Sequence, residues 1–270
     1  AVFHICRIVW LNFKYQAFVL DTMLIMGHAN LPRDDKVSDG GDDAWFVTNS
    51  IVNAMGVADG VGSWRRYGIN AGKCARCVMR VAKDYFIQGG EVVSESLLEA
   101  DNNCREQGST TALVAYLNDD NTLNISQVGD SNLIVIRDNR IAFQTESGTH
   151  SRDAPYAMGL GSKDNFNKVC IDYTFFCKTG DIIIMGTDGL WDNLYPVQII
   201  DILNTTQLKS PTRMAKVLLS IAYEKSEDEE IWSPYSQTAY EAGDIYDTLD
   251  LSVWEGGKPD DITIVVAIVE

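Results

Sequence analysis

The sequence predicts an α+β fold built on antiparallel sheets, and three features support this prediction. Alternating apolar and β-branched residues occur in about eleven short segments, which is the pattern of β-strands. Most of these segments follow one another through short turns, so neighbouring strands are expected to pair antiparallel. The helical stretches come in blocks instead of alternating with the strands, which favours helices packed outside the sheets over a doubly wound parallel sheet.

The expected strands fall into three groups along the chain. Four lie near the N-terminus, four in the middle of the chain, and three in the remainder. Each combines period-two alternation with β-branched residues. By residue number they are 2–10, 16–26, 44–49, 51–58, 110–117, 122–128, 132–137, 139–144, 169–176, 181–187 and 262–269.

Four stretches have the apolar spacing of helices, at residues 69–87, 92–106, 196–203 and 211–225. The last two begin with proline, which is favoured in the first turn of a helix. Residues 226–247 carry seven acidic residues and no basic one. We therefore expect an exposed, solvated loop between the last helix and the last strand.

The composition is that of one globular domain. Of the 270 residues, 46% are hydrophobic, which is enough for a sizeable core and excludes a disordered chain. No repeat or low-complexity linker divides the sequence, so we expect a single domain over residues 1–270, acting as a monomer. The formal net charge of −16 would repel a phosphate backbone, so nucleic acid is not an expected partner.

Cysteine usage and hydropathy bear on the compartment. Six scattered cysteines are too few for a disulfide framework in so long a chain and fit a reducing compartment. The most apolar region, residues 15–27, is interrupted by Asp21 and is shorter than the roughly 20 residues that a membrane-spanning helix needs. We therefore expect an intracellular protein, cytoplasmic or organellar, without a membrane span.

Several aspartates lie where predicted strands begin or end. Because a sheet is a rigid platform, acids at several strand ends can converge on one point. Converging carboxylates repel one another unless they share protons or bind cations, and hard oxygen ligands select Mg²⁺ or Mn²⁺. The candidate ligands are Asp42, Asp43, Asp59, Asp130, Asp188, Asp260 and Asp261.

A simpler interpretation exists for two of these positions. Asp-Gly is also the commonest hairpin signal, so residues 59–60 and 188–189 could be ordinary turns. Against this, four acidic or glycine-bearing breaks are each attached to a strongly apolar strand, which favours a metal site. These breaks are DGVG (59–62), GDS (129–131), TDGLWD (187–192) and PDDITIV (259–265).

Six longer segments occur in a characteristic order. They are GGDDAWF (40–46), VADGVGSW (57–64), GSTTALVA (108–115), VGDSNLIV (128–135), TDGLWDNL (187–194) and KPDDITIVVA (258–267). In order and spacing this set resembles the metal-dependent serine/threonine protein phosphatases of type 2C, and the resemblance covers about residues 20–270. The first two segments look closest to the compact branch of mitochondria and plastids. The resemblance implies a four-layer α-β-β-α sandwich, with two antiparallel sheets flanked by helices.

The resemblance also implies a cofactor and its ligands. Two Mg²⁺ or Mn²⁺ ions would be bound, with Asp59 bridging them and the Gly60 carbonyl binding the second ion. Asp188 and Asp260 match the remaining ligands of the first ion. Asp130 matches the residue that holds a weaker third ion together with Asp188.

The implied reaction is the hydrolysis of phosphoserine and phosphothreonine in a phosphoprotein substrate. Two metal ions would share a water and lower its pKa, so that the attacking group is hydroxide. Asp43 matches the carboxylate that holds this water, with Asp42 in the adjoining acidic position. Asp43 and Asp59 are therefore the expected catalytic residues. Asp261 stands where the family usually has asparagine.

Two positions depart from the family pattern. Val61 replaces a histidine that protonates the leaving oxygen in many relatives, which leaves metal-bound water or His150 as the acid. Ser38 replaces a phosphate-binding arginine. The candidate substitutes are Lys36, Arg33, Arg65 and Arg66, of which the Arg65-Arg66 pair is favoured because it directly follows the metal loop.

Cys74 and Cys77 have the spacing of redox and zinc motifs, and Cys74 to Arg80 has the Cys-x5-Arg spacing of cysteine-dependent tyrosine phosphatases. That phosphate loop requires glycine and a preceding strand, so that backbone amides surround the phosphate. Here both cysteines continue an apolar stripe at helical spacing, so core packing is favoured.

Two other functions remain as alternatives to a protein phosphatase. The first is a pseudo-phosphatase that keeps the fold as a binding module, which would be marked by a lost metal carboxylate. The second is a two-metal hydrolase of small phosphoesters or nucleic acid, which a comparison of substrates would separate.

Overall fold

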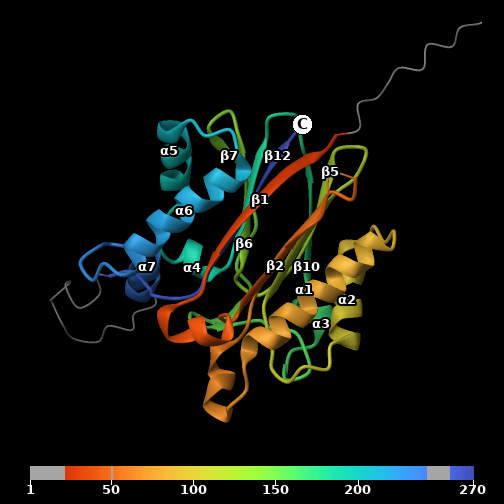
Figure 1. Ribbon diagram of the computed structural model, residues 1–270, viewed down its shortest axis with the longest axis vertical. Helices are drawn as coiled ribbons and strands as arrows, with labels where there is room; N and C mark the ends of the chain where they lie inside the picture. Colours follow the sequence, from red (N-terminus) through yellow and green to blue (C-terminus); the bar gives the residue numbers. More distant parts are fainter. Residues whose placement is uncertain (1–21, 50, 242–255) are drawn as a thin grey trace, which may run out of the picture.

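Two five-stranded antiparallel sheets packed face to face form the centre of the protein (Figure 1). The computed structural model describes residues 22–49, 51–241 and 256–270. The first sheet has the order β1 (Leu24–Leu31), β12 (Ile262–Val269), β11 (Ile182–Gly186), β6 (Asn132–Arg137) and β7 (Arg140–Gln144). The second has the order β10 (Ile171–Phe176), β5 (Thr122–Val128), β4 (Ala112–Leu117), β3 (Ala54–Asp59) and β2 (Asp43–Val47). A separate short hairpin consists of β8 (Thr149–Ser151) and β9 (Ala154–Pro155).

Helices cover the outer face of each sheet. On the second sheet lie α1 (Ala71–Ile87), α2 (Val93–Asn103) and the short α3 (Phe166–Val169). On the first sheet lie α4 (Asp188–Trp191), α5 (Pro196–Thr206) and α6 (Pro211–Ser226), and α7 (Pro234–Glu241) follows in the chain. The result is an α-β-β-α sandwich, which confirms the expected fold class.

The apolar core has three layers, and alternate residues of one strand contribute to different layers. In β11, Ile183 and Met185 pack between the two sheets, while Ile184 faces the helices. Strands buried on both faces are apolar at every position. This explains why the segment around β11 appears in the sequence as a continuous apolar run.

The first described strand lies further along the chain than expected. β1 begins at Leu24 and pairs with β12 as far as Leu31, whereas the sequence indicated 16–26. Polar residues interrupt its apolar pattern, and Gly27 is required for packing. A Cβ at Gly27 would lie 2.2 Å from the backbone nitrogen of Thr212 at the start of α6. The expected strand 2–10 and residues 16–21 lie outside the described residues.

The acidic segment is not the loop that the sequence indicated over 226–247. Residues 234–241 form α7, in which Ser236 and Ala239 are buried. The hydroxyls of Ser233 and Ser236 both donate to the carbonyl oxygen of Gly256, at 2.6 and 2.7 Å. These bonds connect α7 to the chain that enters β12. Residues 242–247 lie outside the described residues.

One pair of cysteines corrects the expectation of reduced thiols. Cys77 in α1 and Cys104, directly after α2, form a disulfide with a Cα–Cα distance of 5.9 Å. The sequence did not indicate this pair, because it depends on how α1 packs against α2. Cys74 is buried in the core as expected, and burial raises its pKa to about 12. A thiol in this state does not act as a nucleophile at neutral pH.

The hydropathy of the sequence also led us to expect no membrane span. Among the helices in the three described stretches, none combines the length and the apolar character needed to cross a membrane.

Candidate metal centre

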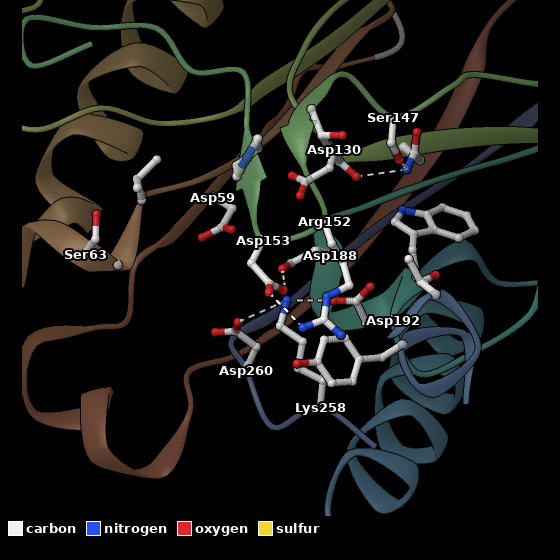
Figure 2. Close-up of a pocket in the computed structure, with 18 residues that line it drawn as sticks. Asp59, Ser63, Asp130, Ser147, Arg152, Asp153, Asp188, Asp192, Lys258 and Asp260 are labelled. Carbon is white, nitrogen blue, oxygen red and sulfur yellow. Dashed lines mark hydrogen bonds and ion pairs between the residues drawn. The ribbon is translucent and has the colours of Figure 1, made fainter. Parts of the chain in front are cut away.

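A pocket lined by carboxylates opens at one end of the two sheets (Figure 2). It lies where β3, β5 and β11 end and where β12 begins, because antiparallel pairing brings these ends together. Its volume is about 420 Å³. The charged residues that line it are Asp59, Asp130, Asp153, Asp188, Asp192, Asp260, Arg152 and Lys258.

Asp59 is held at the end of β3 by the neighbouring strand segment. In the register of β2 and β3 it lies opposite Asp43. Its backbone N–H donates to Thr111 Oγ1 at 2.9 Å, and its carbonyl oxygen accepts from Thr110 Oγ1 at 2.8 Å. The two threonines of the GSTTALVA segment therefore hold the Asp59 backbone in place.

Asp43 is buried at the start of β2, lines a neighbouring pocket instead of the carboxylate pocket, and is only partly hydrogen-bonded. Thr187 donates its hydroxyl to Asp43 Oδ2 at 2.8 Å, while Asp43 Oδ1 is buried without a partner among the described residues. Burial, followed by the charge of Asp261, raises the pKa of Asp43 well above its usual value. An unpaired carboxylate oxygen in this position is suited to a further proton donor or a cation.

Neither Asp-Gly pair forms a hairpin turn. Gly60 leads into a 3₁₀ turn (Gly62–Tyr67), and Asp188 is the first residue of α4. Gly189 allows α4 to approach the start of β12 closely, because a Cβ there would lie 2.1 Å from the carbonyl oxygen of Asp261. The metal interpretation of both pairs therefore fits the backbone better than the turn interpretation.

Gly189→Ala is expected to lower the free energy of unfolding by about 1–3 kcal/mol, because the added methyl group would force α4 away from β12. Urea denaturation of the purified protein measures this change. Gly62→Ala is the matched control, since its Cβ would meet only Asp42 Oδ2 at 3.8 Å. Equal unfolding free energies of the two variants would show that there is room for a methyl group between α4 and the start of β12.

Two ammonium groups stand among the carboxylates. Lys258 Nζ lies 2.6 Å from Asp188 Oδ2 and 2.6 Å from Asp192 Oδ2. Burial lowers the pKa of Lys258, but Asp188, Asp192 and Asp260 raise it by more, so the net pKa lies above its usual value. Lys258 is therefore a permanent positive charge within the cluster.

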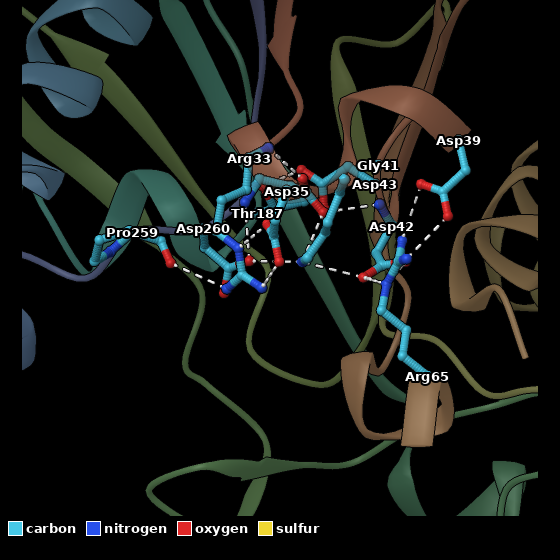
Figure 3. Close-up of polar contacts among 12 residues, drawn as sticks. Arg33, Asp35, Asp39, Gly41, Asp42, Asp43, Arg65, Thr187, Pro259 and Asp260 are labelled. Atoms are coloured by element: carbon cyan, nitrogen blue, oxygen red, sulfur yellow. Dashed lines mark hydrogen bonds and ion pairs between the residues drawn. The ribbon is translucent and has the colours of Figure 1, made fainter. Parts of the chain in front are cut away.

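Lys36 occupies a second such position, among Asp42, Asp260 and Asp261. Figure 3 shows the polar contacts of this region, with Asp42 and Asp260 labelled. Lys36 is 5% exposed, and its Nζ lies 3.0 Å from Asp42 Oδ2, 3.1 Å from Asp260 Oδ1 and 3.0 Å from Asp261 Oδ2. Burial lowers the pKa of Lys36, but the three carboxylates raise it by more. Lys36 thus connects Asp42, next to β2, to Asp260 and Asp261, just before β12.

Three carboxylates of the pocket, Asp59, Asp130 and Asp192, ionise with difficulty. Burial, followed by repulsion from Asp188 and Asp192, raises the pKa of Asp130 to about 7. Burial also raises the pKa of Asp192 to about 6, against the lowering effect of Lys258. The pKa of Asp59 is raised well above its usual value by burial and then by Asp188. Bound cations would relieve this repulsion.

The donor set fits hard divalent ions. Besides Asp43 Oδ1, the pocket aspartates Asp130 and Asp188 each have one buried oxygen without a partner among the described residues. In the described part of the chain, no three acidic, histidine or cysteine side chains are arranged to hold a metal ion together. Lys36 and Lys258 lie between the acids. The unpaired oxygens are the positions at which Mg²⁺ or Mn²⁺ would be accommodated.

The sequence is similar to plant phosphatases over most of its length. Probable protein phosphatase 2C BIPP2C1 of Oryza sativa subsp. japonica is 35% identical over 264 residues, which cover 95% of this chain and 44% of that protein. Probable protein phosphatase 2C 26 of Arabidopsis thaliana is 31% identical over 258 residues, which cover 90% of this chain and 83% of that protein. This chain belongs to the protein phosphatase 2C family.

Solved structures agree with this membership. The X-ray structure of the photosystem II phosphatase PBCP superimposes on this 2C-family chain with a TM-score of 0.87 and 28% sequence identity. The match covers 92% of this chain and 99% of the PBCP chain. The catalytic domain of PstP in complex with two manganese ions has a TM-score of 0.65 at 18% identity, which shows a shared fold. No protein-family model matches the sequence. The chain spans about half the length of the first curated relatives that it matches, 44% and 52% for two of them.

Two of the residues expected to bind substrate phosphate form ion pairs with aspartates of this 2C-family protein instead. Arg65 donates to both oxygens of Asp42 and to Asp39, and Lys36 is paired as described above. Asp42 is therefore neutralised by basic side chains, and it does not line the carboxylate pocket. Arg66 is exposed beside a smaller pocket that also includes Asp59, Asp260 and Arg33.

Asp261 and His150 lie outside the carboxylate pocket. Asp261 accepts the backbone N–H groups of Arg33 and Asp42, at 2.6 and 2.8 Å, so it fixes the chain that leads into β2. His150 Nε2 lies 2.8 Å from Asp164 Oδ1 in a neighbouring pocket. The position of His150 does not favour the role of general acid.

The sequence analysis missed Lys258, Asp192 and Arg152 as members of the site. Lys258 stands two residues before Asp260, and Asp192 lies one helical turn after Asp188, so both were within quoted motifs. The fold alone brings Arg152, on the turn between β8 and β9, into the pocket. Its guanidinium lies 5.2 Å from the ring centre of Tyr235 in α7.

Proposed function

We propose that this chain is a Mg²⁺- or Mn²⁺-dependent phosphatase that hydrolyses phosphoserine and phosphothreonine in proteins. The observation that carries the proposal is the convergence of Asp59, Asp188 and Asp260 with buried, unpaired carboxylate oxygens in one pocket. Membership of the 2C family supports it. We also propose that residues 1–270 act as one catalytic unit and as a monomer, with a phosphoprotein as substrate.

The proposed ligands follow from the pocket and the family pattern. Asp59 would bridge two ions, the Gly60 carbonyl would bind one of them, and Asp188 and Asp260 would bind the other. Asp130 lies beside Asp188 at the pocket wall. When bound, the ions would lower the pKa of a shared water and neutralise charge on the phosphoryl oxygens.

The side chains of the protein contribute orientation and charge. Asp43 would accept a hydrogen bond or a proton from the attacking water at Oδ1, while Thr187 holds its other oxygen. Lys258 and Arg152 bring positive charge to the pocket wall, where a phosphoryl group would enter. Arg152 is our candidate for a phosphate contact, because it lines the carboxylate pocket, whereas Lys36 and Arg65 do not.

The two alternative functions are less well supported. A pseudo-phosphatase would be expected to lack a metal carboxylate, whereas Asp59, Asp188 and Asp260 are all present. A hydrolase of nucleic acid would be expected to surround its pocket with positive charge. Here the pocket lining has six aspartates against one arginine and one lysine.

Manganese-dependent hydrolysis of a phosphothreonine peptide by the purified chain tests the proposal. We expect phosphate release that falls tenfold or more in excess EDTA and returns when Mn²⁺ is added, because the carboxylates alone cannot activate water. An aryl phosphate and an oligonucleotide serve as comparison substrates. Undiminished activity in EDTA, or cleavage of the oligonucleotide alone, would overturn the proposal.

The compartment remains a proposal. The expected location is intracellular, cytoplasmic or organellar, and the similarity to a photosystem II phosphatase supports the organellar alternative. Fractionation of cells that express the full-length protein, with immunodetection, would distinguish an organelle from the cytosol.

A further inference from the structure

Lys258 stands where a cation would otherwise be needed, between Asp188 at the start of α4 and Asp192 directly after it (Figure 2). Its Nζ lies 2.6 Å from Asp188 Oδ2, 2.6 Å from Asp192 Oδ2 and 3.9 Å from Asp260 Oδ2. Converging carboxylate oxygens of this kind are the donors that Mg²⁺ and Mn²⁺ use. We propose that Lys258 is a built-in cation of the centre, which takes the place of a third divalent ion and limits the site to two ions. The inference rests on the proposed metal-dependent function.

The charge of the pocket lining agrees with two ions. Six aspartates face one lysine and one arginine, which leaves four negative formal charges. Two divalent ions neutralise four negative charges without remainder. Arg152 is paired with Asp153 at 3.0 Å, so Lys258 is the cation of the pocket lining that offsets the five remaining aspartates. Lys36 contacts Asp260 from outside the lining and shares its charge with Asp42 and Asp261. A third divalent ion would bring an excess of positive charge to a partly buried site, which is unfavourable.

Asp188 has one oxygen for each kind of cation. Its Oδ2 accepts a hydrogen bond from Lys258, whereas its Oδ1 is buried and has no partner among the described residues. One carboxylate can therefore bind the ammonium on one side and a metal ion on the other. Asp260 is arranged differently, because its Oδ1 accepts from Lys36 at 3.1 Å and its Oδ2, 3.9 Å from Lys258, is the oxygen that is left for a metal ion.

The backbone of Lys258 is fixed, which makes the position of its side chain reproducible. Asn193, directly after Asp192, accepts the Lys258 N–H at 2.9 Å and donates to the Lys258 carbonyl at 3.0 Å. The Tyr235 ring lies 5.6 Å from Nζ and covers the side chain. The preceding residue, Gly257, donates its N–H to Asp228 at 2.8 Å. Contacts on both sides thus direct Lys258 toward Asp188.

Equilibrium dialysis of the full chain against saturating manganese chloride, with bound metal quantified by atomic absorption, tests the inference. We expect two ions on the wild type and three on Lys258→Met, because loss of the ammonium opens a position between Asp188 and Asp192. Lys258→Arg should keep two ions because it keeps the charge. Lys209→Met, an exposed lysine between α5 and α6, should also bind two.

The double variant Lys258→Met/Asp192→Asn should return to two ions, because it removes a ligand of the position that was opened. Three ions on the wild type, or two on Lys258→Met, would overturn the inference. Fewer than two ions on the wild type would instead overturn the proposed metal centre, so the two failures are distinguishable. Circular dichroism shows whether Lys258→Met folds, and the wild-type stoichiometry tests the inference even if it does not.

Discussion

Asp59→Asn is expected to lower kcat for a phosphothreonine peptide by a factor on the order of 10³, even at saturating Mn²⁺. The amide removes the negative charge that is proposed to bridge both ions. The protein fold should survive, because the bonds that hold this residue come from its backbone N–H and carbonyl to Thr111 and Thr110. Steady-state kinetics with manganese titration measures the loss.

The same substitution is expected to stabilise the protein in the presence of a chelator. Burial and the neighbouring carboxylates raise the pKa of Asp59 well above the value of 3.8 that applies in the unfolded chain. The folded state therefore keeps a proton that the unfolded state loses, and ionisation of Asp59 destabilises the fold as pH rises above about 4. Asn cannot ionise, so Asp59→Asn should exceed the wild type in Tm by little at pH 4 and by more at pH 8. Each kcal/mol of destabilisation that the substitution removes should raise Tm by about 2–4 °C.

Asp119→Asn is the matched control for both measurements, since Asp119 is exposed in the turn between β4 and β5. It should leave kcat and Tm unchanged. Wild-type activity of Asp59→Asn at saturating Mn²⁺ would contradict the bridging role. A lower Tm of this variant in chelator at pH 8 would contradict the repulsion among the pocket carboxylates.

The positions of the main acids could be predicted because each is local to a strand end. Asp59, Asp130 and Asp188 each follow an apolar run, and the ends of antiparallel strands meet at one edge of the sandwich. Strand identity, the helices α1 and α6 and the four layers followed from periodicity and family resemblance in the same way. These features need no knowledge of which side chains touch.

Contacts between distant segments could not be predicted. Lys36 pairs with Asp260 and Asp261 across more than two hundred residues, and Cys77 meets Cys104 only because α1 packs against α2. Helix α7 arises within an acidic segment because bonds to the Gly256 carbonyl hold its start. In each case the deciding interaction is tertiary, so local propensity and charge pattern carry too little information.

Lys36→Met tests whether this residue binds substrate phosphate or supports the fold. We expect a loss of about 3–5 kcal/mol in the free energy of unfolding, because the carboxylates of Asp42, Asp260 and Asp261 would lose a buried partner. Of these three carboxylates, Arg65 contacts Asp42, and Lys258 lies 3.9 Å from Asp260. The pKa of Lys36 is raised above its usual value of 10.5, so Lys36 stays charged in the folded protein at neutral pH. The difference in unfolding free energy between wild type and Lys36→Met should therefore persist between about pH 6 and 9.

Chemical denaturation in the presence of EDTA separates this effect from any change in metal binding. Lys36→Arg should recover much of the lost stability because it restores the charge, and Arg66→Met should cost little because Arg66 is exposed. A residue that contacts substrate would instead raise KM and leave the unfolding free energy unchanged. That outcome for Lys36→Met would restore the phosphate-binding role that its ion pairs now argue against, and it would imply that Asp42 and Asp261 are neutralised in another way when substrate is bound.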